Sequence, residues 1–317
     1  MGSMDYSPGQ YRILKFLILK IFNIKGKRAK ISKRAVHKII FKITQEATNE
    51  NFKKAAPFYW YKYGPFSELV ETALDDLLLS EALTEVRVSE DATLLALTDM
   101  GKELCIKMYE ELDMDVIPES EIKILKNMVR KANLFKFDKY VKEIYDNYAP
   151  YRFMNIYKFG FLPTFEKYVH RRVVEGQSSL FPKQEIEEIE YLLYECEANL
   201  PKDRLFKSFN ESFSNYATTL SRCLEAEKSY ENLSIALELA KDIWLTFAGG
   251  VRIFAHDEYY KNKIVYWREQ FLIDCLSLNQ KIRKFSDMVM KNWKPQSLKV
   301  SEREKKILSA ALIDYAL

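Results

Sequence analysis

Eleven basic residues and no acidic residue lie between Gln10 and Lys42. Lysine and arginine side chains neutralise phosphate groups, so a run of this kind suits contact with a nucleic acid or another polyanion. The whole chain has a net charge of only +4, so its positive charge is concentrated at one end. The alternative is an ordinary solvated charged face. The sequence predicts that the phosphate-binding face contains Lys25, Lys27, Arg28, Lys30, Lys33, Arg34, Lys38 and Lys42.

The segment that follows has the opposite charge. Between Ser67 and Glu85 there is no basic residue, and the acidic residues are Glu68, Glu71, Asp75, Asp76, Glu81 and Glu85. On a helix, several of these side chains would face outward and repel phosphates. Two alternatives stay open: the early helices bind DNA without this segment and with weak sequence specificity, or the acidic helix docks a basic protein partner.

Arg252 and His256 are the residues with the chemistry of a nuclease. The pair resembles the Arg-His signature of HEPN domains, in which the two side chains polarise an RNA 2′-hydroxyl and a phosphate. Only three residues separate the pair here, fewer than is usual in that family, and Gly249 and Gly250 stand close before it. The alternative is an ordinary Arg and His near a helix end. We therefore expect no catalytic residue, and a HEPN-like ribonuclease stays an alternative function.

Other chemistry is poorly represented in the sequence. The chain has four cysteines, none in a CxxC pair, and three histidines, so we expect no metal site and no cofactor. Residues 140–168 hold ten Tyr or Phe. Such rings can stack on single-stranded bases, but aromatic residues more commonly pack cores and interfaces, so we expect them to fill a junction between domains.

The elements that would position these residues begin with three helices. The first covers residues 11–23, and the second follows Ser32, which suits a helix N-cap. The spacing of Val36, Ile39, Ile40 and Ile43 predicts a buried stripe on the second helix. Gly64 and Pro65 are expected to open a third helix, with Pro65 in its first turn. Alternating residues 84–88 and 93–97 predict a hairpin, and a further helix follows from residue 98.

Helices followed by a hairpin and another helix are typical of a winged helix-turn-helix domain. The segment Tyr63-Gly64-Pro65-Phe66-Ser67 resembles the junction motif of the Panacea antitoxin-like group, and Leu97-Thr98-Asp99-Met100-Gly101 is similar to the element that follows the wing in that group. The resemblance covers roughly residues 30–112. It implies a winged-helix fold and a role as an antitoxin or regulator, with Tyr63, Gly64 and Pro65 as the family motif.

The second half of the chain has the pattern of long amphipathic helices. Apolar residues alternate at three- and four-residue steps along four segments, which predicts an antiparallel helical bundle. A last short helix is expected over residues 302–315. We take Met1-Gly2-Ser3 as a remnant that precedes a native start at Met4. The predicted division is a winged-helix domain over residues 4–115, an aromatic-rich helical connector over 116–176 and a helical bundle over 177–317.

These observations predict a mainly α protein that is not an enzyme. The predicted function is that of a cytoplasmic, prokaryotic, DNA-associated transcription regulator or antitoxin-like protein that binds phosphates through its basic N-terminal face. DNA is the expected partner, with a protein partner or a second copy of the chain as further possibilities. No apolar run reaches the roughly 20 residues needed to span a bilayer, so no membrane association is expected.

Overall fold

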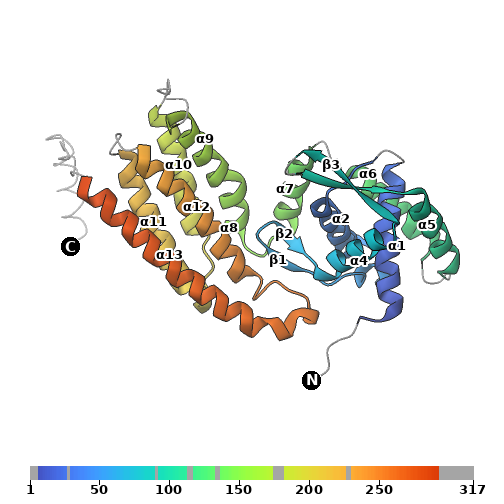
Figure 1. The fold of residues 1–317 in the computed structure, drawn as a ribbon. Helices are drawn as coiled ribbons and strands as arrows, with labels where there is room; N and C mark the ends of the chain where they lie inside the picture. Colours follow the sequence, from blue (N-terminus) through green and yellow to red (C-terminus); the bar gives the residue numbers. More distant parts are fainter. Residues whose placement is uncertain are drawn as a thin grey trace, which may run out of the picture.

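A computed structural model describes residues 6–26, 29–89, 92–112, 117–132, 136–173, 182–225 and 230–292. The described chain is mainly helical, in agreement with its low glycine and proline content, and its strands form two short antiparallel hairpins. Two halves lie side by side along the long dimension of the molecule (Figure 1). The N-terminal half contains α1 to α7 and both hairpins, and the C-terminal half contains α8 to α13. The short helix predicted over residues 302–315 and residues 1–3 lie outside the described residues.

The N-terminal half is built around α1, which contacts α2, α4, α5 and α6. Its core residues include Leu14, Phe16, Leu17 and Phe22, all fully buried. Helix α7 packs on α2. The elements of this half are α1 (Pro8–Lys25), α2 (Lys33–Glu46), α3 (Glu50–Lys53), β1 (Tyr59–Tyr61), β2 (Gly64–Phe66), α4 (Glu68–Leu79), β3 (Leu83–Ser89), β4 (Ala92–Leu97), α5 (Asp99–Glu111), α6 (Glu119–Lys131) and α7 (Phe137–Tyr148).

Local signals fix the ends of several helices as expected. The Ser32 hydroxyl accepts a hydrogen bond from the backbone N–H of Ala35 and caps α2. Thr98 caps α5 in the same way, by accepting from Gly101. The predicted hairpin is confirmed as β3 and β4, which pair in antiparallel register from Leu83 opposite Leu97. A side chain at Gly101 would place its Cβ 2.0 Å from the carbonyl oxygen of Ala82, so a glycine lets α5 approach this hairpin closely.

The expected role of Gly64 and Pro65 is wrong. These residues do not open a helix; they form β2, which pairs with β1 so that Tyr61 lies opposite Gly64. Gly64 has a φ of 88°, a conformation that glycine adopts without steric cost. Helix α4 starts afterwards, capped by Ser67, whose hydroxyl accepts from Val70 N–H. The sequence motif is therefore a tight hairpin, because a residue with positive φ closes the two-residue loop.

The C-terminal half consists of long helices around an aromatic core. Helix α12 contacts α9, α11 and α13, and α10 contacts α11 and the π-helical segment η2. Phe153, Phe206 and Phe247 are buried with their rings in contact. The elements are α8 (Arg152–Asn155), η2 (Ile156–Phe161), α9 (Leu162–Val173), α10 (Pro182–Ala198), η3 (Arg204–Phe206), α11 (Lys207–Glu225), α12 (Tyr230–Val251), η4 (Glu258–Lys263) and α13 (Ile264–Asn292).

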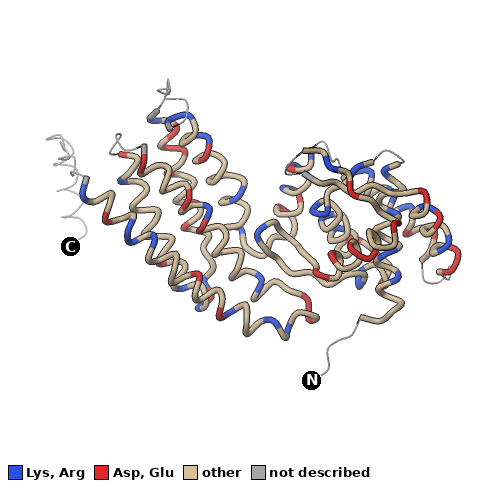
Figure 2. The backbone as a smooth tube through the Cα atoms, in the orientation of Figure 1, with Lys and Arg blue, Asp and Glu red and all other residues tan. Residues whose placement is uncertain are grey.

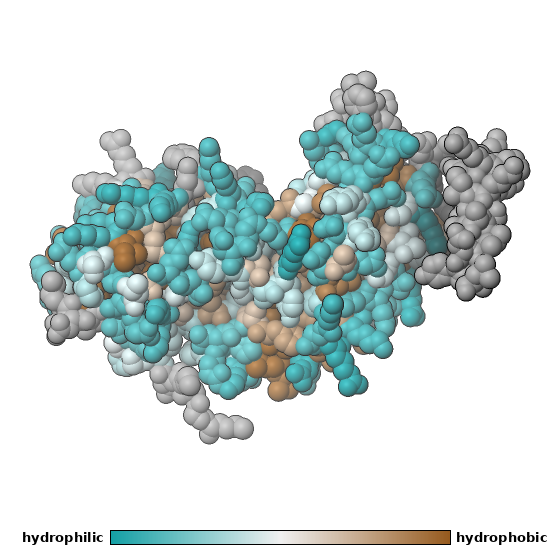
Figure 3. All heavy atoms as spheres, turned by 180° about the vertical axis from the view of Figure 1, so that it is seen from behind, coloured by the Kyte–Doolittle hydropathy of each residue, from teal (hydrophilic) through white to brown (hydrophobic). Residues whose placement is uncertain are grey.

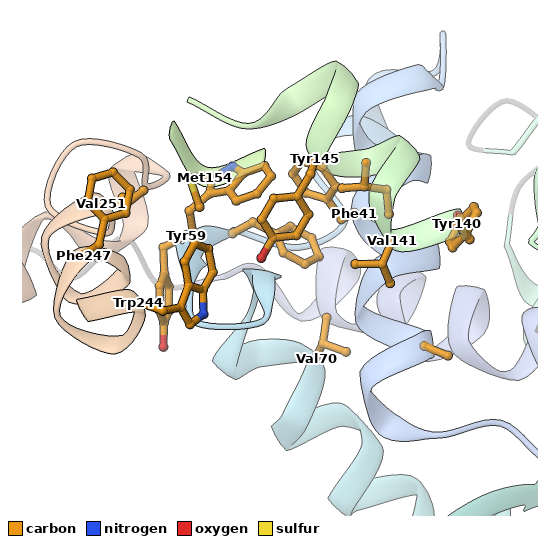
Figure 4. Packing of buried hydrophobic residues seen from close by; sticks show 14 of the residues in the cluster. Phe41, Tyr59, Val70, Tyr140, Val141, Tyr145, Met154, Trp244, Phe247 and Val251 are labelled. Atoms are coloured by element: carbon orange, nitrogen blue, oxygen red, sulfur yellow. The ribbon is translucent and has the colours of Figure 1, made fainter. Parts of the chain in front are cut away.

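The two halves share one apolar core. In Figure 4, Phe247 and Val251 lie at one side of the view, Tyr140 and Val141 at the other, and Tyr145 and Trp244 between them. Backbone hydrogen bonds also join the two halves. For example, the Trp60 N–H donates to the Ala255 carbonyl at 2.8 Å. Most aromatic residues between positions 140 and 168 are buried and pack within the core. Tyr145 lies where the two halves meet, in contact with Trp60 and Trp244, whereas Phe153 and Phe161 pack inside the C-terminal half.

The outer face of α13 is unusually apolar. Figure 3 shows hydrophobic surface at the lower middle of the molecule, where Figure 1 places the first half of this helix. The exposed large hydrophobic residues of this segment are Val265, Tyr266, Leu272, Ile273 and Leu276, and the charged Arg268 and Glu269 are exposed among them. Within the described ranges, no helix has both the length and the apolar character that crossing a bilayer requires.

Candidate functional site at the Tyr63 hairpin

The predicted basic face is not continuous. Lys38 is 2% exposed, and its ammonium donates to the Pro65 carbonyl at 2.7 Å. Lys42 is 8% exposed and pairs with Glu143 at 2.6 Å. Both side chains share a face with Arg34, as their spacing predicts, but that face lies against β2 and α7. The expectation that Lys38 and Lys42 contact phosphates is wrong, because a polyanion cannot reach them.

The other described members of the predicted face differ in their surroundings. The ammonium of Lys25 donates to the Ala132 carbonyl at 2.6 Å, and burial lowers the pKa of Lys25. Lys30 and Arg34 are exposed, whereas Lys27 and Arg28 lie outside the described residues. Figure 2 shows basic and acidic positions interleaved along the backbone of the N-terminal half.

The acidic helix α4 neutralises part of the basic run inside the fold. Lys33 pairs with Asp75 at 2.8 Å, which raises the pKa of Lys33. Lys15 pairs with Asp76 at 2.6 Å. The opposite charges of the two segments are thus matched within the N-terminal half. This pairing engages Lys33 of the predicted phosphate-binding face and Lys15 of the same basic run, together with Asp75 and Asp76 of the acidic helix.

His37 is part of the same contact between α2 and α4. Its Nε2 lies 2.7 Å from Glu71 Oε1, and its Nδ1 accepts from Ser67 N–H at 3.3 Å. Only the tautomer with hydrogen on Nε2 satisfies both contacts. Burial is the largest influence on this ring and lowers the pKa of His37, although Glu71 favours the charged form. The hydrogen bond with His37 lowers the pKa of Glu71.

We expect acid to destabilise the protein through this pair. The folded-state pKa values of His37 and Glu71 both lie below their unfolded values, so the unfolded chain binds more protons as the pH falls. The loss of unfolding free energy begins near pH 6.5, where an unfolded histidine titrates, and has a slope of up to about 1.4 kcal/mol per pH unit for each proton. Urea unfolding of wild type and His37→Gln at pH 7, 6 and 5 measures it. Equal pH slopes in the two proteins would contradict the assignment.

Arg252 and His256 have a packing role at the junction. Helix α12 ends at Val251, so the pair does not lie on successive turns of one helix. The Arg252 guanidinium lies over the Tyr61 and Trp267 rings at 5.2 and 5.3 Å. His256 forms a backbone bridge with Tyr59. These contacts match the alternative of an ordinary Arg and His near a helix end.

A different set of cations gathers around Tyr63, at the tip of the β1–β2 hairpin. Tyr63 is 53% exposed, the most open of the aromatic residues in its neighbourhood. Three cations approach its ring centroid: Arg34 at 5.3 Å, Lys62 at 5.4 Å and Lys158 at 5.9 Å. Arg34 comes from α2, Lys62 from the hairpin and Lys158 from η2 in the C-terminal half. We call these four residues the Tyr63 platform.

Lys158 is held rigidly within this platform. Its ammonium donates to the Tyr145 hydroxyl at 2.6 Å and to the Lys62 carbonyl at 3.2 Å. The Trp244 ring lies 4.9 Å from the same ammonium. Burial, and then the charge of Arg34, lowers the pKa of Lys158 to about 7. Lys158 also lies in a π-helical segment, a feature that is frequent at functional sites.

The cations of the platform have no ion-pair partner among the described residues. Among the ion pairs of the described residues, none involves Arg34, Lys62 or Lys158. The charged groups that act on Lys158 and on the buried Lys38 beneath it are other cations. Like charges held this close destabilise the fold, so the arrangement is suited to an anion that neutralises them.

Sequence reasoning identified Tyr63 and Arg34 but missed Lys62 and Lys158. The family motif drew attention to Tyr63, and the basic run contained Arg34. Lys158 was assigned to a region of packing aromatic residues, and Lys62 to no site. Nothing in the spacing of positions 34, 62 and 158 connects them; the available signal was that Lys62 directly precedes Tyr63.

The platform therefore has to be interpreted from its geometry and charge. Its exposed ring and its three cations are the features that bear on a ligand. Comparison of the chain with protein-family models, with curated proteins and with solved structures finds no match.

Proposed function

We propose that this chain is a non-enzymatic, nucleic-acid-associated protein that contacts phosphates through the Tyr63 platform. The observation that carries the proposal is the exposed Tyr63 ring with three cations within 6 Å and no carboxylate partner for them among the described ion pairs. Guanidinium and ammonium groups bind phosphate oxygens, and an open ring adds a surface for a base. This proposal keeps the predicted partner class and moves the contact from the basic N-terminal face to the junction.

The order of the N-terminal elements supports a regulatory or antitoxin-like role. Helices α1, α2 and α4, the β3–β4 hairpin and α5 follow the order of a winged helix-turn-helix domain, with α3 and the β1–β2 hairpin between α2 and α4. The close approach at Gly101 gives a physical reason for the glycine that resembles the family element. We include membership of the Panacea-like group in the proposal. The long helices of the C-terminal half would form its antiparallel bundle.

Removing two platform charges tests the function. We expect Arg34→Ala/Lys62→Ala to weaken oligonucleotide binding about tenfold at low salt and to reduce the salt dependence by about two charges. Fluorescence anisotropy over a range of salt concentrations measures both. Lys183→Ala/Lys202→Ala removes two exposed lysines from the C-terminal half and is the matched control. Equal affinity in the two double variants, or no binding by the wild type, would refute the proposal.

Docking of a protein partner is a second candidate function. The exposed apolar residues of α13, such as Leu272, Ile273 and Leu276, favour it, because exposed apolar patches mark interaction surfaces. The acidic helix α4 is less suited to this role than the sequence predicts, because Glu71, Asp75 and Asp76 have partners within the fold.

A further inference from the structure

The shape of the Tyr63 platform favours one strand of nucleic acid over a duplex. The three cations all lie within 6 Å of one ring. A duplex is bound by cations distributed along its two phosphate backbones. An unpaired nucleotide presents one base and one phosphate, and these two groups are about as far apart as the Tyr63 ring and the cations. The cluster is therefore matched in size to a single nucleotide.

The surroundings of the platform also disfavour a duplex. In the winged-helix arrangement, the helix before the wing enters the major groove. That helix would be α4, whose exposed side includes Asp75 and which contains no lysine or arginine. Lys38 and Lys42, which share a face of α2 with Arg34, are buried and cannot extend the contact along a second backbone.

The platform is also preorganised. The Lys62 carbonyl accepts two hydrogen bonds from the C-terminal half, from Trp244 Nε1 at 3.0 Å and from Lys158 Nζ at 3.2 Å. Behind the loop, a side chain at Gly64 would place its Cβ 3.0 Å from the Tyr145 ring, so the hairpin is closely packed. The backbone on both sides of Tyr63 is thus held in place, so the hairpin loses little conformational entropy when a ligand binds at its tip.

We infer that the Tyr63 platform binds an unpaired nucleotide of a single-stranded nucleic acid, with the base on the Tyr63 ring and the phosphate among Arg34, Lys62 and Lys158. This inference rests on the proposed function and specifies its ligand. The neutral base accounts for the part of the Tyr63 ring that the three cations over it leave exposed, and the phosphate accounts for the cations without carboxylate partners. An acidic peptide would neutralise the same cations, but its carboxylate side chains give the exposed ring no aromatic ring to stack on.

Binding of matched oligonucleotides to ring variants tests the inference. A labelled single-stranded DNA 12-mer and its duplex are titrated with the full chain as wild type, Tyr63→Phe and Tyr63→Leu. Stacking on an aromatic side chain contributes roughly 1–3 kcal/mol per base, so Tyr63→Leu should weaken single-strand binding about fivefold or more, while Tyr63→Phe stays near wild type. The single strand should bind more tightly than the duplex. Tyr63 is exposed, so both variants should keep the wild-type melting temperature.

The possible results separate the inference from the function on which it rests. If the duplex binds at least as tightly as the single strand, or if Tyr63→Leu equals Tyr63→Phe, the inference is overturned. The function survives that result as long as Arg34→Ala/Lys62→Ala still weakens binding relative to its lysine control. If poly-glutamate binds the platform more tightly than either oligonucleotide, the ligand is an acidic protein and both the inference and the proposed function fail.

Discussion

Replacing Lys158 with methionine is expected to raise the unfolding free energy at pH 7 by about 1–3 kcal/mol while weakening nucleic-acid binding. The Lys158 side chain is half-buried, and this burial together with repulsion by Arg34 lowers the pKa of Lys158 to about 7. Methionine has a similar length and needs no hydration, so it removes this cost. The gain is reduced because the Tyr145 hydroxyl, whose partner is Lys158, loses that hydrogen bond.

The stability gained by Lys158→Met should decrease as the pH rises. The pKa of Lys158 is lower in the folded protein than its value of about 10.4 in the unfolded chain. The cost of burying the Lys158 charge therefore lowers the unfolding free energy fully below pH 7, and this cost decreases as the pH rises toward 10.4. Urea unfolding at pH 6, 7, 8 and 9 should show the advantage of Lys158→Met shrinking over this series. Lys167→Met, at an exposed position on the adjacent α9, is the control and should change little. A loss of stability in Lys158→Met at every pH would mean that Lys158 serves the fold alone.

Trp244→Ala is expected to lower the unfolding free energy by about 3–5 kcal/mol. Trp244 is buried at the junction, where its ring lies near Tyr145 and Tyr157 and its N–H donates to the Lys62 carbonyl. Truncation removes the apolar contacts and leaves a cavity between the two halves. It also removes the hydrogen bond from Trp244 to the Lys62 carbonyl in the hairpin loop. Chemical denaturation measures the loss, and hydrogen exchange of the β1–β2 amides reports whether the hairpin opens.

Trp244→Phe separates the ring from its hydrogen bond. Phenylalanine keeps most of the apolar volume, and Lys158 continues to donate to the Lys62 carbonyl, so the expected cost of the lost hydrogen bond is about 1 kcal/mol. Losses of equal size in Trp244→Ala and Trp244→Phe would show that the hydrogen bond, and not the packing of the ring, holds the hairpin to the C-terminal half.

Local sequence patterns predicted several elements because the controlling interactions are local. Ser32 and Thr98 cap helices through hydrogen bonds that span three residues. The alternation that predicted the β3–β4 hairpin has the period of a strand. Gly64 misled the prediction, since a glycine before proline fits a helix start as well as a hairpin, and only the pairing of β1 with β2 separates the two. The domain limits stay a prediction, and the boundary expected near residues 176–182 falls almost wholly outside the described residues.

The charge asymmetry shows how a correct sequence observation leads to an incomplete site. The basic run and the acidic segment are real, but Lys33 and Lys15 pair with Asp75 and Asp76 across α2, α1 and α4. Charge counts along a chain do not record which groups meet in space. The free energy of such pairs depends on distance and burial, which the fold determines.

The sequence by itself determined the mainly helical class, the caps, the second hairpin and the buried stripe of α2, since each depends on residues a few positions apart. Only the tertiary structure decided which cations are available to a ligand. Packing buried Lys38 and Lys42, paired Lys33 with α4, and brought Lys158 from the C-terminal half to within 6 Å of Tyr63. The physical reason is that burial and ion pairing depend on distances between segments far apart in the chain, and these distances exist only once the two halves have packed together.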